Sequence, residues 1–323
     1  MNPKFTIIIV NYNSGDQVKD LIMSIDTNIA SKQIIIIDNA SIDNSRDILA
    51  KICLDEMLIV WNDENIGFGR ANNIGAKIAQ GEFLIFINPD SKLIEDTNME
   101  SYFLNYLSDS EVGIVAPKII YPDGTVQPSW VQRYSTLQTF IAQLLSLGAI
   151  YRRLRSVKLL KWMMSAVGNL LFPNSADEYI HRFEEVSQAY SCCWVSGACF
   201  AIRKELFNKI GGFDDRFFLY SEDEDLCRRL KIYGKKIIYD PTIRVCHDVG
   251  GTSIRSSCIG VLGQASASKI ESGLIYLRKY TEKDWEWVKW SYIIVVTLRL
   301  TLGFYVVMSP RKCFQLLTRL IQV

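Results

Sequence analysis

Short apolar runs alternate with segments of helical periodicity over the first part of the chain, and this alternation constrains the fold more than any other feature. The runs are Phe5–Val10, Gln33–Ile37, Met57–Trp61, Phe83–Ile87 and Val112–Ala116. They are too short for helices and rich in β-branched residues, which is typical of strands buried on both faces. The segments between them predict helices at Val18–Ile25, Ser45–Cys53 and Arg70–Ala79. Strands that alternate with helices indicate a doubly wound α/β sheet of parallel strands.

Polar clusters follow three of these predicted strands. They are Asn11–Ser14, Asp38–Ser41 and Asn88–Ser91. Ligands of doubly wound sheets bind outside the carboxyl ends of the strands. We therefore expect the binding site at the edge where these three clusters meet.

The composition limits the classes of protein that fit. The chain has 323 residues, of which 49% are hydrophobic, so it can form a large core. Its net charge of +1 argues against a nucleic-acid partner, which normally selects a basic excess. The 8 cysteines show no C-x-x-C spacing, which favours reduced thiols in a cytosolic protein over a zinc site. We expect no signal peptide, because the start of the chain leads directly into the first strand.

An acidic stretch, Glu222-Asp-Glu-Asp225, follows an aromatic-rich segment and begins a predicted helix. Apolar surroundings raise the pKa of a carboxylate, which makes it a usable general base. Asp223 is the predicted base and Glu222 the second candidate. The alternative is an acidic first turn, which the helix dipole favours at any helix N-terminus.

A glycine-containing segment, Asn65–Asn73, follows the third predicted strand and begins a helix. It departs from a dinucleotide fingerprint because Asn72 occupies the position of the third glycine. A helix N-terminus with small residues can still bind a diphosphate, although a simple turn is the alternative.

Two further residues are candidates for a metal or phosphate site. Asp90, in Asn88-Pro-Asp90, places one carboxylate at a strand end, where a divalent cation on a diphosphate needs an oxygen ligand. His247 is one of only 2 histidines and could complete such a site with Asp90. A strand-end turn and a loop histidine are the simpler interpretations.

The second half of the chain departs from the alternating pattern. From about residue 135 to 188 it contains Tyr151–Met164, which predicts a basic amphipathic helix, or alternatively a solvated helix over the core. The β-like run Ser191–Ile202 then resumes the core. Ser291–Met308 has about the minimum length of a membrane span, but Arg299 in its middle favours helices that lie in the membrane interface.

Together these motifs resemble glycosyltransferase family two, the inverting, nucleotide-sugar-dependent enzymes of the GT-A fold. The matching segments are Val10–Asn13, Ile37–Ser41, Asn65–Asn73, Phe86–Asp90, Val195–Ala198, Gly211–Asp214, Phe218–Arg228 and His247–Gly251. Their order and spacing cover about residues 4–255 and are most similar to the rhamnosyltransferase branch. The chain has Asn88 where the family often has the first acid of Asp-x-Asp, which leaves Asp90 as the one anionic ligand.

The resemblance implies a GT-A catalytic domain at residues 1–255, with a doubly wound mixed sheet. It places a helical, basic insertion at residues 135–190 and a membrane-associated helical region at residues 256–323. A location on the cytoplasmic face of the bacterial inner membrane is expected.

The resemblance also implies roles for single residues. The donor would contact Asn11, Asn13, Asp38, Asn65, Gly67 and Asp90, with Asp38 on the pyrimidine ring. Asp90, assisted by His247, would bind Mg²⁺ or Mn²⁺. Asp223, or next Glu222, would take the proton from the acceptor. The acceptor side would include Ser196, Gly197, Asp225 and Arg228.

The implied partners are a dTDP- or UDP-linked sugar donor and a lipid-linked glycan. L-Rhamnose is the best match for the donor sugar, with galactofuranose, glucose and GlcNAc as alternatives. A sugar-1-phosphate nucleotidyltransferase would need a glycine-rich, basic N-terminal loop, which Asn11–Gly15 does not provide. A non-catalytic nucleotide- or glycan-binding membrane scaffold remains a second alternative.

Overall fold

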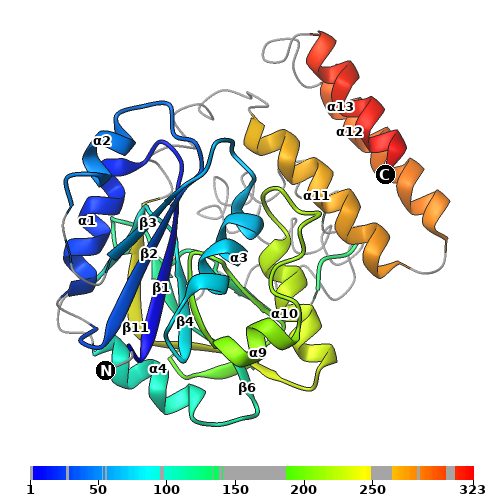
Figure 1. Cartoon of the computed structure of the whole chain (residues 1–323). Coiled ribbons are helices and arrows are strands. Elements are labelled where there is room, and N and C mark those ends of the chain that lie inside the picture. The colour runs from blue at the N-terminus through cyan, green and yellow to red at the C-terminus, as the bar shows by residue number, and fades with distance from the viewer. Residues whose placement is uncertain are drawn as a thin grey trace. The chain divides into compact units, whose positions relative to one another are not determined.

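The computed structural model describes most of the chain outside the central insertion. The described residues are 3–26, 29–52, 54, 57–94, 98–132, 134–137, 140, 187–248, 264–281, 284–302 and 310–323. The predicted basic helix Tyr151–Met164 lies outside them. The chain divides into two compact units, Met1–Arg133 with Glu185–Arg255 and Tyr134–Glu184 with Ser256–Val323 (Figure 1).

A mixed sheet forms the centre of the first unit. Among the described residues it has 9 strands in the order β3-β2-β1-β4-β10-β6-β11-β5, with β8 paired to β11. The strands are β1 (Phe5–Asn11), β2 (Lys32–Asp38), β3 (Met57–Trp61), β4 (Phe83–Ile87), β5 (Ser91–Leu93), β6 (Val112–Ile120), β8 (Tyr190–Cys192), β10 (Cys199–Arg203) and β11 (Lys236–His247). A smaller sheet pairs β7 (Trp130–Val131) with β9 (Trp194–Val195).

The five predicted strands are confirmed, and they run in one direction. β3, β2, β1 and β4 pair in parallel, whereas β10 lies antiparallel between β4 and β6. The run Ser191–Ile202 does return to the core, but it is divided among β8, β9 and β10 instead of forming one strand.

Each face of the sheet has its own core layer, because successive side chains of a strand point to opposite faces. One layer contains α1 (Gly15–Asp26), α2 (Ser45–Leu49) and α4 (Met99–Leu107). The other contains α3 (Phe68–Ile78), α9 (Lys204–Lys209) and α10 (Glu222–Ile232) (Figure 1).

All three predicted helices have other bounds in the structure. The helix predicted at Val18–Ile25 begins earlier, at Gly15, and ends at Asp26. The helix predicted at Ser45–Cys53 ends at Leu49, because the amides of Lys51 and Ile52 bond three residues back and tighten the chain into a turn. The helix predicted at Arg70–Ala79 already begins at Phe68.

The described part of the second unit consists mainly of α11 (Gln264–Tyr280), α12 (Trp285–Leu302) and α13 (Pro310–Gln322). Tyr292 donates a hydrogen bond to the carbonyl of Ile270 at 2.9 Å, and the Phe140 ring packs against Tyr276 and Tyr292. Of the predicted segment Ser291–Met308, residues 291–302 belong to α12 and the rest lies outside the described residues. No described helix combines the length and apolar content that crossing a membrane requires.

Candidate active site

A buried hydrogen-bond network joins the carboxyl ends of β1 and β2. The Asn11 amide donates to Asp38 Oδ1 at 2.8 Å and to Ser41 Oγ at 3.0 Å. Asp38 Oδ2 accepts from Arg46 Nε at 2.7 Å, and the Arg46 guanidinium lies 5.5 Å from the centre of the Trp61 ring. The Asp38 side chain is fully buried and already bonded by these groups. In the structure Asp38 therefore holds the ends of β1 and β2 together. Its contact with a pyrimidine stays a prediction.

Asn13 forms the outer turn of this corner. Its backbone has a φ of 57°, a left-handed conformation that asparagine tolerates better than most residues. Its backbone N–H donates to Ser41 Oγ, and its side-chain oxygen accepts from the backbone N–H of Ile42, both at 2.9 Å. Asn13 thus holds the turn after β1 against the segment Ser41–Ile42 that follows β2. Its predicted contact with the donor stays untested.

Asn39 connects this corner to the glycine loop, although the sequence interpretation gave it no separate role. Its amide donates to Asn65 Oδ1 and to the carbonyl of Gly67, both at 3.1 Å. Its oxygen accepts from the Asn62 amide at 2.9 Å. The side chain is almost completely buried, and its bond to the Gly67 carbonyl is shielded from water. Its position in the polar cluster after β2 was the available signal.

Gly67 brings the glycine loop against the segment that precedes the acidic helix. Its φ is 91°, and a Cβ at this position would overlap the carbonyl oxygen of Phe218. The next residue, Phe68, donates its N–H to the same oxygen at 2.8 Å. Only glycine allows both the positive φ and this close approach.

Asp90 and His247, far apart in sequence, lie side by side in the structure. His247 Nε2 is 3.0 Å from Asp90 Oδ1 and 3.2 Å from the Asn88 amide nitrogen. The other ring nitrogen is 3.0 Å from Gln127 Oε1. Both side chains of the Asp90–His247 pair are mostly buried. Gln127, which orients the imidazole, had no signal in the sequence.

These residues could hold a divalent cation only together with another ligand. Among the described residues there is no cluster of three or more His, Cys, Asp and Glu side chains. Asp90 and His247 offer one oxygen and one nitrogen at a strand end. This small donor set fits Mg²⁺ or Mn²⁺, because such ions on phosphates take few protein ligands and complete their shell with phosphate oxygens and water.

Asp223 is held by backbone donors at the start of α10. Its Oδ2 accepts from the N–H of Gly197 at 2.9 Å, and its Oδ1 accepts from the N–H of Glu224 at 2.8 Å. Burial raises the pKa of Asp223 although both of these bonds oppose the shift. The side chain is partly accessible. The carboxylate is therefore oriented and more basic than a free one.

Glu222 has different surroundings from its neighbour. It is 4% exposed, and its Oε2 has no hydrogen-bond partner among the described residues. Burial, followed by the nearby charge of Asp223, raises the pKa of Glu222 well above its usual value. The backbone enters this helix through Tyr220 and Ser221 with φ values of 71° and 67°, which is a strained path for residues other than glycine.

The predicted acceptor-side residues do not share one environment. Gly197 contacts Asp223, and the Ser196 hydroxyl accepts from the N–H of Ala198 at 3.2 Å. Asp225 is fully buried in an ion pair with Arg229 at 2.7 Å, so its carboxylate stabilises α10. The four-residue spacing of this pair could have predicted it. Arg228 is partly exposed. Contacts of these residues with an acceptor remain predictions.

The short loop between β9 and β10 forms hydrogen bonds both to the acidic helix and to the end of β4. The carbonyl of Ala198 accepts from the N–H of Asn88 at 2.9 Å, next to Gly197 with its bond to Asp223. The Asp90–His247 pair, the glycine loop and Asp223 are thus linked through adjoining backbone segments of the first unit.

The fold is shared with solved glycosyltransferases. GalNAc-T7, solved with UDP, GalNAc and Mn²⁺, matches with a TM-score of 0.57 at 16% identity, over 87% of this chain and 50% of that one. The mannosyltransferase PcManGT from Pyrobaculum calidifontis, solved with GDP-Man and Mn²⁺, matches with a TM-score of 0.53 at 14% identity, over 99% of this chain and 86% of that one. The mixed α/β sheet of this chain therefore has the GT-A fold.

The family follows from the sequence match. A family model described as Glycosyl transferase family 2 matches residues 6–211, and the chain belongs to this family.

Curated relatives of this chain include rhamnosyltransferases. An N-acetylglucosaminyl-diphospho-decaprenol L-rhamnosyltransferase of Mycobacterium tuberculosis is 24% identical over 76% of this chain and 76% of its own length. Rhamnosyltransferase WbbL of Escherichia coli K12 is 22% identical over 75% of this chain and 82% of its own length. The O-antigen biosynthesis protein RfbC of Myxococcus xanthus is 25% identical over 76% of this chain, which spans only 17% of that protein.

Proposed function

We propose that this chain is an inverting glycosyltransferase that moves L-rhamnose from dTDP-rhamnose to a hydroxyl of a lipid-linked glycan, in the synthesis of a bacterial surface polysaccharide. The observation that carries the proposal is the Asp223 carboxylate, oriented by Gly197 and made more basic by burial. The names of two relatives state rhamnose transfer, and one of these names also states a lipid-linked acceptor. The dTDP carrier is inferred from the family resemblance described above. Galactofuranose, glucose and GlcNAc are the alternative donor sugars.

Asp223 acts as the general base in this proposal. A sugar hydroxyl has too high a pKa to attack unaided, so Asp223 takes its proton while the oxygen attacks the anomeric carbon. Base catalysis of this kind typically contributes about 10²–10⁴-fold in rate. Attack from the face opposite the departing nucleoside diphosphate inverts the anomeric centre.

The other side chains bind and orient the donor. The network of Asn11, Asp38 and Asn39 shapes the nucleotide side, and the Gly67 loop lets the backbone approach the nucleotide closely. Asp90 and His247 would hold Mg²⁺ or Mn²⁺, which when bound neutralises the negative charge of the diphosphate leaving group. Gln127 keeps the His247 ring turned toward Asp90.

Association with the cytoplasmic face of the inner membrane is part of the proposal. Trp287, Trp290 and Ile294 are 67%, 47% and 56% exposed on α12. Their spacing of three and four residues places them on one helix face. Tryptophan and aliphatic side chains on one face suit the membrane interface, where a lipid-linked acceptor would be found.

Replacement of the proposed base tests the reaction. Asp223→Asn keeps the shape of the side chain but removes the proton acceptor. Turnover should fall by about 10²-fold or more, while the Kd for the donor stays nearly unchanged. Transfer from dTDP-rhamnose to a lipid-linked acceptor and calorimetric titration of the donor give the two quantities.

Asp20→Asn, an exposed change on α1, is the matched control and should leave both quantities unchanged. An equal loss of donor binding and turnover would show that Asp223 is a ligand of the donor. Wild-type turnover in a folded Asp223→Asn protein would show that Asp223 is not the base. No transfer by the folded wild type from any of the candidate donors would instead favour a non-catalytic scaffold.

A further inference from the structure

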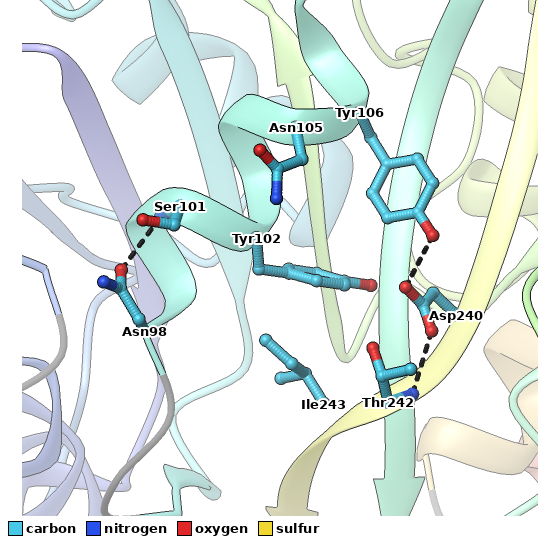
Figure 2. A pocket seen from close by; sticks show the side chains of 8 residues that line it. All are labelled: Asn98, Ser101, Tyr102, Asn105, Tyr106, Asp240, Thr242 and Ile243. Atoms are coloured by element: carbon cyan, nitrogen blue, oxygen red, sulfur yellow. Dashed lines mark hydrogen bonds between the residues drawn. The ribbon is translucent and has the colours of Figure 1, made fainter.

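A recess lies between α4 and β11, in the core layer opposite to the one that contains α10 (Figure 2). Its volume is about 470 Å³, within the range of about 300–1,000 Å³ that is common for small-molecule sites. A water molecule takes about 30 Å³ in the liquid, so the recess has room for much more than a bridging water. None of the residues proposed for the active site lines it.

The walls of this α4–β11 recess combine hydroxyl and amide groups with two aromatic rings. Ser101, Asn105 and Thr242 are exposed, and their side chains can each donate and accept hydrogen bonds. Tyr102 and Tyr106 of α4 point toward β11 (Figure 2). Among the described residues, no lysine, arginine or histidine lines the recess.

Asp240 provides a fixed carboxylate beside the two tyrosines. Its Oδ2 accepts from Tyr106 Oη at 2.6 Å, and its Oδ1 accepts from the N–H of Thr242 at 2.8 Å. The side chain is 4% exposed. The carboxylate is therefore held in place by groups of the recess itself.

Tyr102 has a hydroxyl whose hydrogen-bonding capacity is not used. The residue is 6% exposed, and its Oη has no partner among the described residues. An unpaired buried hydroxyl costs free energy that a water or ligand oxygen can recover. Burial and then the charge of Asp240 raise the pKa of Tyr102, and burial and the bond to Asp240 raise that of Tyr106 to about 12. Both hydroxyls are thus O–H donors at neutral pH.

We propose that the α4–β11 recess binds a neutral carbohydrate ring, as a glycan site separate from the donor and acceptor sites of the proposed function. Adjacent hydroxyls of a sugar both donate and accept, which matches the mixed lining of Ser101, Asn105 and Thr242. The partly exposed ring of Tyr106 offers apolar surface to the C–H groups of a sugar. The described part of the lining has no basic side chain, which disfavours a phosphate, and its polar groups disfavour an apolar ligand.

Saturation-transfer NMR on the full-length protein tests the site. The probes are the methyl glycosides of rhamnose, galactose, glucose and N-acetylglucosamine, each at millimolar concentration. At least one should receive saturation from the protein. The double variant Asn105→Ala/Thr242→Val removes two polar contacts, so the affinity should fall by about tenfold. Both positions are exposed, so the variant is expected to fold.

Two further variants locate the binding. Asn208→Ala changes an exposed asparagine on α9 and should keep the wild-type signal. Asp223→Asn should also keep it, whether or not the chain transfers sugar, because the recess is separate from the acidic helix. A signal that is lost in Asp223→Asn but unchanged in the double variant would place the sugar at the active site and overturn the proposal. If none of the four glycosides receives saturation from the wild-type protein, the proposal is also overturned.

Discussion

Adjacent carboxylic acids at the start of α10 have different surroundings, and this difference can be measured. Asp223 is bonded to two backbone N–H groups, whereas Glu222 is buried with an unpaired oxygen. When the surroundings of two neighbouring acids separate their pKa values, one often acts as a proton acceptor and the other stays protonated. We expect Asp223 to accept the proton while Glu222 stays neutral beside it.

The unpaired carboxyl of Glu222 should make stability fall as pH rises. Its folded pKa lies well above the unfolded value, so its contribution is fully present below the unfolded pKa and is lost as pH rises through the folded one. Glu222→Gln cannot ionise. Its advantage in free energy of unfolding should therefore grow with pH through this window, by at most about 1.4 kcal/mol per pH unit.

Denaturant unfolding at a series of pH values measures this difference between the two proteins. Glu205→Gln, at an exposed position of α9, is the control for removal of a negative charge. A constant difference between wild type and Glu222→Gln across the acidic and neutral range would contradict the prediction.

The pairing of Asp90 and His247 predicts a metal requirement. Asp90→Ala removes the single anionic donor of this site, so donor binding should lose its dependence on Mg²⁺ or Mn²⁺. Excess chelator should inactivate the wild type. Calorimetric titration of the donor with and without cation is the measurement. Full activity of the wild type in excess chelator would show that the site works without a metal.

At the scale of elements, the contact between the glycine loop and the segment before α10 is open to a matched test. Gly67→Ala imposes both a strained positive φ and an overlap with the carbonyl of Phe218. Gly124→Ala imposes a similar φ of 81°, but no atom lies within contact distance of the added Cβ. Both variants carry the strain of a positive φ, so the difference in their effects reports the overlap with Phe218.

We expect Gly67→Ala to lose donor affinity and turnover together, because it displaces the glycine loop from the acidic helix. Its thermal stability should also fall, since a strained backbone conformation costs about 1–3 kcal/mol. Gly124→Ala should show only a loss of stability. Equal effects of both changes on donor binding would rule out a role for the Phe218 contact.

The elements that could be predicted from sequence are those with a local signal. Strands such as Phe83–Ile87 have a continuous apolar pattern, and their boundaries match closely. The position of β10 between β4 and β6 has no such signal, because it depends on pairing between distant segments. In the same way, the acidic and aromatic context of Asp223 made it a candidate base, a role that stays a prediction, whereas its bond to Gly197 had no signal in the sequence. Gln127 meets His247 from 120 positions away and resembles any loop glutamine.

At the scale of the whole molecule, the exposed face of α12 predicts how the protein distributes between water and membrane. Trp287→Ser/Ile294→Ser removes apolar surface from that face and changes no residue of the first unit. Flotation with anionic vesicles should show less bound protein than for the wild type, at low and at high salt. Donor hydrolysis should be unchanged.

Ile232→Ser is the control, because it removes an exposed apolar side chain of the first unit, which is 74% exposed on α10. This variant should bind vesicles like the wild type. Unchanged flotation of the α12 variant would mean that another surface, or no membrane at all, is involved.

The place of β10 in the sheet sets the order in which a growing chain can assemble on the ribosome. β10 pairs with β4 but follows it by about 110 residues, which takes roughly 6–22 s at about 5–20 residues per second. Until then, β4 presents an apolar edge with unpaired N–H and C=O groups, a template for pairing with another nascent chain. The loop that carries Gly197 emerges just before β10. The backbone donor of Asp223 is therefore synthesised together with the strand that ends this vulnerable interval.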